Sequence, residues 1–254
     1  MADDPRRSKP HATDQRQPAE GRYEPAARPG RPVGSYLTAH VSASAVAANL
    51  AALRRAVPAG TDVCAVVKAD AYGHGLGGLL ETIAAGADWL AVSTPGEALA
   101  LRDAGYDGPV LMFFSACAHG DGGERAAVLR DLVARDVTLT VVAPAEVAEV
   151  RRAARDAARP ARVHVKVDTG MGRSGIPADR AASLVATLRD AGGVELDGLY
   201  THFAIADEPV RSGAVDVTAE QVRLFRDVAA RCGGAGRLRL HAANSAATLT
   251  RPET

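Results

Sequence analysis

The chain lacks an excess of charge of either sign, because 30 basic residues balance 30 acidic ones. Proteins that bind nucleic acid or a membrane surface usually carry a clear basic excess, so we expect neither partner. No run of apolar residues reaches the ~18 that a membrane span requires, and the N-terminus has no apolar core typical of a secretory signal. These absences predict a soluble protein that stays in the cytoplasm.

Cysteine is also scarce. The three that occur, Cys64, Cys117 and Cys232, are far apart and form no CxxC pair. An odd number of cysteines does not make a closed set of disulfides, so the composition favours a reducing cytosol. We expect no metal site.

Lysine is rarer than any other charged residue: of 30 basic residues, only Lys9, Lys68 and Lys166 are lysine. The chain therefore uses arginine wherever a positive charge is enough. Arginine is a poor nucleophile because its pKa lies above ~12, whereas a lysine amine can lose its proton when it is desolvated. Unless their positions are chance, Lys68 and Lys166 indicate chemistry that requires an amine.

The composition divides the chain into two parts. Residues 1–34 hold six of the 14 prolines and many charges of both signs, with Tyr23 as the only aromatic residue. Such a segment buries too little apolar surface to offset the entropy lost on ordering, so we expect a disordered tail. We expect residues 35–254 to form one folded domain.

Apolar, strand-like runs alternate with amphipathic helical stretches from residue 36 onward, which is typical of βαβ units. The runs are continuously apolar, as in parallel sheets that are covered on both faces. Seven such units after an initial helix favour an α/β fold, a (β/α)8 TIM-type barrel that lacks its eighth strand, with an open doubly wound sheet as the alternative. The expected strands are 63–69, 89–94, 109–114, 137–142, 161–168, 194–203 and 237–244, and the expected helices are 44–57, 76–86, 95–105, 122–135, 144–158, 178–191 and 217–232.

In a (β/α)8 barrel the reactive groups lie at the C-terminal ends of the strands. The first strand ends in AVVKADAYGHG, which places Lys68 after four apolar residues at the barrel mouth. We expect desolvation to lower the pKa of this amine and to make it available for a Schiff base. The glycine-rich loop that follows supplies Tyr72 and His74. The alternative is a lysine that simply leaves the barrel into solvent.

The fifth strand and its loop read RVHVKVDTGMGRSGI. His164, Lys166 and Asp168 share one face of this strand, because side chains alternate along a strand. If that face points into the barrel, a charged Lys166 is costly unless it is paired or chemically modified. A salt-bridged barrel interior is the alternative interpretation. The turn that follows presents Arg173 at the mouth, where it suits a carboxylate or a phenolate oxygen.

The sixth strand ends in GLYTHFA and the seventh in HAANSA. The first of these places His202 at a strand tip. The second places Asn244 and Ser245 at the start of a helix, where they either cap free backbone amides or bind a phosphate. The loops after the seventh and eighth strands are the usual phosphate site of a barrel. An amine, an arginine, an imidazole and a phosphate-binding turn together suit pyridoxal phosphate.

Four segments resemble the signature segments of the alanine racemase family. AVVKADAYGHG, VHVKVDTGMGRSG, YTHFA and HAANSA occur in the family's order, and the likeness covers about residues 36–254. The resemblance implies a barrel that binds pyridoxal 5′-phosphate and interconverts L-alanine and D-alanine, supplying D-alanine for peptidoglycan. It also implies a homodimer with shared active sites.

The resemblance implies roles for the candidate residues by their positions in these segments. Lys68 would carry the cofactor and act as one of two racemising bases. Tyr72, Asn244 and Ser245 would hold the phosphate, and His202 would pack against the pyridine ring.

Three further residues receive roles from the same resemblance. Arg173 would contact the phenolic oxygen and the substrate carboxylate. Lys166 would be the lysine that is often carbamylated in this family, and His241 would support the residues that touch the cofactor.

The sequence departs from the family's pattern at its end. Family chains continue with an eighth strand that carries an arginine near the pyridine nitrogen, and then with a β-domain that carries the tyrosine acting as the opposite base. We therefore expect the 254 residues to be a truncated chain that does not racemise alanine by itself. The alternatives are a non-enzymatic pyridoxal phosphate carrier and an inactive fragment.

Overall fold

The structure is a computed structural model that describes residues 39–254, except for residues 119, 211, 235, 237 and 252–253. The disordered tail predicted for residues 1–34 lies outside the described residues. Residues His40–Thr254 cluster into one unit, and the fold below is that of this unit.

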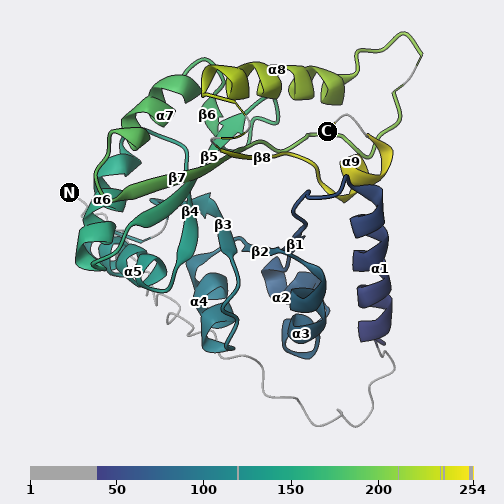
Figure 1. Ribbon diagram of the computed structural model, residues 1–254, viewed down its shortest axis with the longest axis horizontal. Helices are drawn as coiled ribbons and strands as arrows, with labels where there is room; N and C mark the ends of the chain where they lie inside the picture. The colour runs from purple at the N-terminus through teal and green to yellow at the C-terminus, as the bar shows by residue number, and fades with distance from the viewer. Residues whose placement is uncertain (1–38, 119, 211, 235, 237, 252–253) are drawn as a thin grey trace, which may run out of the picture. The chain divides into compact units, whose positions relative to one another are not determined.

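The described residues build a curled parallel sheet (Figure 1). Its seven-strand path runs β1-β2-β3-β4-β5-β7-β8, and the short strand β6 pairs beside β5. Because the strands follow one another in chain order, without the reversal of a doubly wound sheet, that alternative is wrong. The strands are β1 (Cys64–Val66), β2 (Trp89–Val92), β3 (Val110–Ser115), β4 (Val137–Val141), β5 (Ala161–Asp168), β6 (Ile176–Pro177), β7 (Val194–Tyr200) and β8 (Arg239–His241).

Helices connect the strands along the outside of the curled sheet (Figure 1). Each longer helix between two parallel strands is the crossover that parallel pairing requires. They are α1 (Ala43–Ala56), α2 (Lys68–Gly73), α3 (Leu76–Gly86), α4 (Pro95–Asp103), α5 (Gly122–Ala134), α6 (Glu146–Asp156), α7 (Ala181–Arg189), α8 (Val217–Arg231) and α9 (Ser245–Thr250). Within the described residues, β1 and β8 are the two edge strands of the sheet. The sheet therefore holds seven strands of a barrel, as the sequence predicts.

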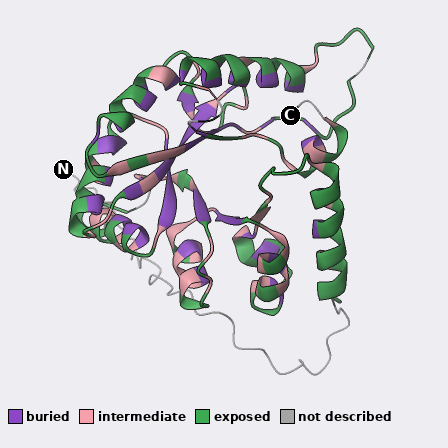
Figure 2. Cartoon of the chain, in the orientation of Figure 1, coloured by how far each residue is buried: buried purple, intermediate pink, exposed green. Residues whose placement is uncertain are grey.

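The apolar core lies between the strands and the outer helices. Strands β2 and β4 are buried at every position, and β5 is buried at all but two (Figure 2). Leu90, Leu139 and Leu184 are among the fully buried side chains. Burial on both faces of the sheet explains why the strand sequences are continuously apolar.

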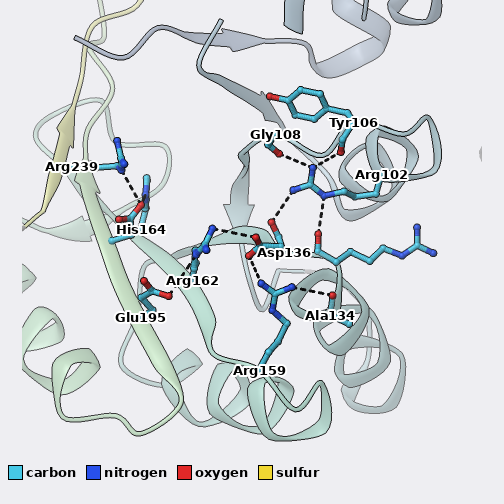
Figure 3. Close-up of polar contacts among 12 residues, drawn as sticks. Arg102, Tyr106, Gly108, Ala134, Asp136, Arg159, Arg162, His164, Glu195 and Arg239 are labelled. Carbon is cyan, nitrogen blue, oxygen red and sulfur yellow. Dashed lines mark hydrogen bonds and ion pairs between the residues drawn. The ribbon is translucent and has the colours of Figure 1, made fainter. Parts of the chain in front are cut away.

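Arginines tie neighbouring loops together at the N-terminal ends of the strands (Figure 3). Arg102 donates four hydrogen bonds of 2.6–2.9 Å, to the carbonyls of Tyr106, Gly108, Arg135 and Asp136. The Asp136 carboxylate pairs in turn with Arg159 and Arg162, at 2.7 and 3.2 Å. Arg239 of β8 pairs with Asp62, which precedes β1, and so links the two edges. This end of the sheet is built for stability.

The structure differs from the sequence prediction mainly after the first strand. Residues 68 and 69 were expected to continue that strand, but β1 ends at Val66, and the segment Lys68–Gly73 forms the separate turn α2. The two-residue strand β6 was not predicted, and the last strand is shorter than residues 237–244. A two-residue strand carries no periodicity, so sequence patterns do not reveal it.

None of the helices in the described residues is long and apolar enough to cross a membrane. Over the same residues, no group of three or more His, Cys, Asp or Glu side chains is placed to hold a metal ion. Cys64, Cys117 and Cys232 are free thiols.

Candidate active site

Lys68 begins the loop after β1, at the C-terminal end of the curled sheet. The ladder continues one residue past the strand, because Val67 donates its amide to the carbonyl of Ala91 over 2.8 Å. Lys68 is half-buried, and its Nζ lies 5.6 Å from the ring centroid of Tyr72. The structure thus brings the amine and the tyrosine together at the mouth.

The four residues after Lys68 form a left-handed turn. Ala69, Asp70, Ala71 and Tyr72 have φ values of 50–56° and ψ values of 38–51°, close to a left-handed helix at about +57° and +47°. None of them is glycine, so the conformation costs roughly 1–2 kcal/mol per residue, or about 4–8 kcal/mol for the turn. Strain of this kind persists where surrounding contacts hold it, and it clusters at functional sites.

Hydrogen bonds to two carboxylates hold this turn. The Asp70 carboxylate accepts the amide of Leu76 over 2.7 Å, and the Asp70 carbonyl accepts the amide of Gly75 over 3.0 Å. From outside the turn, Glu97 of α4 accepts the amide of Ala69 over 2.7 Å. Sequence reasoning did not identify Glu97, because its contact with Ala69 is long-range.

Lys166 lies inside the curled sheet on β5, with 6% of its surface exposed. Its Nζ donates a hydrogen bond to the carbonyl of Ser174. This partner is a neutral group, whereas the alternative interpretation expected a carboxylate. Burial lowers the pKa of Lys166, the nearby Arg173 lowers it further, and Asp168 acts in the opposite direction. The net effect is a pKa of Lys166 below its usual value.

Asp168 shapes the loop that carries Arg173. Its Oδ1 accepts the amides of Gly170 and Gly172 at 3.0 and 3.1 Å. Burial raises the pKa of this carboxyl, but the backbone amides more than offset it and hold the pKa below its usual value. Gly172 has a φ of 69°, which glycine adopts without strain. Arg173 follows directly and is exposed, so a fixed loop presents the guanidinium at the mouth.

His202 is half-buried just after β7. Burial lowers the pKa of its imidazole, and the positive charges of Arg173, Lys166 and Lys68 lower it further, in that order. These three cations come from the loop after β5, from β5 itself and from the end of β1. Because β1, β5 and β7 belong to one parallel sheet, their C-terminal ends lie at the same edge of it and bring these residues to one mouth. The ring is therefore neutral at pH 7, and the positive charge around it suits an anionic ligand.

Gln221 of α8 orders the segment around His202, and sequence reasoning missed it. It is 2% exposed. Its Oε1 accepts the amide of Ala204 over 2.9 Å, and its Nε2 donates to the His202 carbonyl and the Thr169 hydroxyl at 3.2 and 3.1 Å. The sequence did offer one signal. Gln221 occupies a position of the helix at which the 3.6-residue pattern expects an apolar side chain, and a polar residue there indicates a buried polar contact.

His241 lies among aromatic and imidazole side chains inside the curled sheet. Its ring stacks on Tyr200, with centroids 4.6 Å apart and planes inclined by 8°. Its Nε2 lies 3.0 Å from Nδ1 of His164, whose Nε2 lies 3.3 Å from Asp197. Burial and the neighbouring His164 lower the pKa of His241 to about 3. His241 is therefore neutral and contacts other side chains of the sheet interior.

Asn244 and Ser245 lie at the start of the six-residue helix α9. The side chain of Asn244 accepts the amide of Ala247 over 2.9 Å, so it caps the helix, which is the simpler of the two interpretations. Ser245 is exposed at the first helical position. Both residues follow β8, at the same end of the sheet as Lys68.

A curled parallel sheet, outer helices and a cationic mouth at the C-terminal strand ends define an α/β-barrel domain of the kind that carries active sites. The family description "Alanine racemase, N-terminal domain" matches residues 41–254. The chain belongs to the alanine racemase family through this N-terminal domain.

Individual relatives agree with this assignment. The alanine racemase of Beutenbergia cavernae is 43% identical over 171 residues, which are 65% of this chain and 42% of that protein. The solved alanine racemase from D-cycloserine-producing Streptomyces lavendulae is 39% identical with a TM-score of 0.73, over 84% of this chain and 54% of that one. The Bacillus anthracis alanine racemase with bound L-Ala-P is 33% identical with a TM-score of 0.67, over 82% and 51%. The chain thus spans about half the length of the relatives it matches.

Proposed function

We propose that this chain is the barrel part of a pyridoxal 5′-phosphate-dependent alanine racemase. The observation that carries the proposal is the placement of three basic residues, Lys68, Lys166 and Arg173, at the same C-terminal strand ends as His202. Such a mouth suits a flat cofactor that bears a phosphate and a substrate that bears a carboxylate. Membership in the alanine racemase family supports the same activity.

The side chains present fit this cofactor. When bound, pyridoxal 5′-phosphate takes a lysine amine at its aldehyde carbon with loss of water, and it withdraws electrons from the α-carbon of an amino acid. We assign Lys68 as that amine, since Lys166 is buried and bonded to the Ser174 carbonyl. The neutral ring of His202 would pack against the cofactor ring. Arg173 would bind the phenolic oxygen and the substrate carboxylate.

Polar groups on two strand ends would hold the phosphate. Tyr72 is 59% exposed beside Lys68, so its hydroxyl is open to a ligand. Ser245 offers a second exposed hydroxyl after the last strand, where barrels usually bind phosphate. Asn244 would support the Ser245 hydroxyl by capping the first turn of α9, on which Ser245 lies.

Lys68 would move the α-proton on one face of the substrate only. A base that returns the proton to the same face regenerates the starting enantiomer, so inversion requires a second group opposite. The described residues include three tyrosines. Tyr72 lies beside Lys68, Tyr200 is buried and bonded to Thr140 over 2.9 Å, and Tyr106 lies at the far end of the sheet. Since the family resemblance assigns the opposite base to a tyrosine, we propose that the described residues do not racemise alanine by themselves.

We propose Lys166 as a carbamylation site. When its amine is deprotonated, Lys166 would add carbon dioxide and release a proton, leaving an anionic carbamate. The lowered pKa of Lys166 supports this reaction, because only the neutral amine reacts. With labelled bicarbonate, a carbamate carbon signal should appear in the unchanged chain and be absent from Lys166→Ala. A signal that persists in Lys166→Ala would contradict the assignment.

The wider roles remain predictions from the family resemblance. We propose a homodimer, a supply of D-alanine for peptidoglycan, and a cytosolic location, for which the three free thiols are suited. Sedimentation of the purified protein tests the dimer, and a monomer at micromolar concentration would contradict it for these residues.

Exchange of the α-proton of L-alanine tests the proposed chemistry. In deuterium oxide with added cofactor, the chain should exchange this proton while circular dichroism detects no D-alanine. The Lys68→Ala variant should not exchange it. Absence of exchange in the unchanged chain would favour the carrier alternative. D-alanine above the level of Lys68→Ala would show a second base within these residues.

A further inference from the structure

A carboxylate of the neighbouring helix holds the left-handed turn after Lys68. Glu97, at the third position of α4, accepts the amide of Ala69 at Oε1 over 2.7 Å. Its Oε2 accepts the amides of Ser93 and Thr94 at 2.8 and 2.9 Å. One side chain therefore ties the residue next to Lys68 to the loop after β2.

Glu97 is itself fixed at the start of α4. Its amide donates to Oγ1 of Thr94 over 3.3 Å, and the two residues form a capping box. Burial raises the pKa of Glu97, but the amides of Ala69, Thr94 and Ser93 more than offset it, so the pKa lies below its usual value. The side chain is thus ionised at neutral pH and has lone pairs for all three amides.

The start of α6 repeats this arrangement without a lysine. Oε2 of Glu146 accepts the amides of Val142 and Ala143 at 2.7 and 3.3 Å. These amides lie four and three residues before it, as Ser93 and Thr94 do for Glu97. Its Oε1 accepts the hydroxyl of Ser115 at the end of β3. The two glutamates therefore cap equivalent loops and differ in the group that Oε1 holds.

We propose that Glu97 is a positioning residue for Lys68, which holds the Ala69 amide and so keeps the strained turn left-handed and the amine at the mouth. The inference rests on the proposed role of Lys68 as the cofactor-bearing amine. Four consecutive non-glycine residues stay left-handed only where their surroundings over-determine them, and Ala69 is the first of the four. Without the carboxylate, the exposed Ala69 bonds to water, the turn relaxes, and Lys68 moves with it.

The matched glutamates give a controlled test. Glu97→Ala and Glu97→Gln are compared with Glu146→Ala and Glu146→Gln. Amide hydrogen exchange at Ala69 should be about tenfold faster in Glu97→Ala, because a hydrogen bond to a charged acceptor is lost. The same amide should exchange at the normal rate in Glu146→Ala.

The second readout is the rate at which pyridoxal 5′-phosphate is captured on Lys68, trapped with borohydride and measured on the Lys68 peptide. Capture should fall by about tenfold or more in the Glu97 variants, since small displacements of a reacting group have large effects on rate. The Glu146 variants, which lose an equivalent cap, should capture the cofactor at a rate close to that of the unchanged chain.

An equal loss of capture in the two pairs would overturn the inference, because it would reflect general stability. Normal capture in a Glu97→Ala protein whose Ala69 amide exchanges fast would overturn it as well. If Glu97→Ala does not fold, Glu97→Gln supplies the same comparison. Absence of capture on Lys68 in the unchanged chain contradicts the proposed function, and Ala69 exchange then decides separately whether Glu97 holds the turn.

Discussion

Replacing Gln221 with leucine should loosen the segment that carries His202. The side chain makes three hydrogen bonds of 2.9–3.2 Å, to the Ala204 amide, the His202 carbonyl and the Thr169 hydroxyl. At about 0.5–1.5 kcal/mol net for each bond, their loss amounts to about 1.5–4.5 kcal/mol. Leucine buries more apolar surface, and the exposed Ala204 amide recovers a bond to water. We therefore expect a net loss of about 2 kcal/mol.

Urea unfolding measures this loss as a lower midpoint at an unchanged slope. Arg223→Ala, on the same helix, is the matched control. Arg223 is exposed and pairs with Glu220 over 2.6 Å, and surface pairs of this kind contribute little. The imidazole resonances of His202 should shift in Gln221→Leu and stay in place in the control.

Unchanged stability in Gln221→Leu, together with unchanged His202 resonances, would refute the reasoning. It would mean that the loop after β7 is held by other contacts. Loss of stability without a shift of the His202 resonances would refute the positioning role and leave only the packing role.

Three further predictions address other parts of the structure. Arg102→Met removes four hydrogen bonds at the N-terminal strand ends, so the urea midpoint should fall while cofactor capture on Lys68 is unchanged; slower capture would contradict a purely structural role. Asp168 has a folded pKa below its usual value, so its stabilising effect is present above about pH 4 and is lost as the pH falls through the folded pKa. Asp168→Asn should therefore be less stable than the unchanged chain at neutral pH, and acid unfolding should show the difference shrinking below pH ~4. Ser245→Ala should weaken cofactor binding by about 1 kcal/mol, whereas Arg173→Ala should mainly weaken alanine binding; equal effects on both ligands in dialysis would contradict that division.

Much of the fold was predictable because the central strands β2, β4 and β5 are buried at all or nearly all positions. The expected strand at residues 161–168 coincides with β5 (Ala161–Asp168), and the stretch 76–86 coincides with α3 (Leu76–Gly86). Capping chemistry helped as well, since Thr94 and Pro95 mark the start of α4. Local signals of this kind are strong where the local pattern and the tertiary burial agree.

The turn after Lys68 was not predictable from local preferences. Its residues, Ala69 to Tyr72, favour right-handed backbone, and the left-handed form is held by backbone amides that donate to the carboxylates of Asp70 and Glu97. The contact between Glu97 and Ala69 joins positions 28 residues apart. Such a contact overrides local propensity and leaves no periodic signal in the sequence.

The candidate site was predictable where its residues occupy strand ends. Lys68, Arg173 and His202 could be placed at one mouth because parallel strands present their C-terminal ends together. The supporting residues Gln221 and Glu97 could not, because they act through backbone atoms of distant segments. The spacing of residues along a sequence indicates which side chains share a face of a strand or helix and which lie at the same end of a sheet. It does not indicate which distant backbone groups a side chain contacts.

The site of cofactor attachment tests the central claim most directly. The unchanged chain is incubated with pyridoxal 5′-phosphate, reduced with borohydride and digested, and the labelled peptide is identified by mass spectrometry. We predict the label on the peptide that contains Lys68, and no such label in Lys68→Ala. A label on Lys166 or Lys9 in the unchanged chain, with Lys68 unmodified, would contradict it.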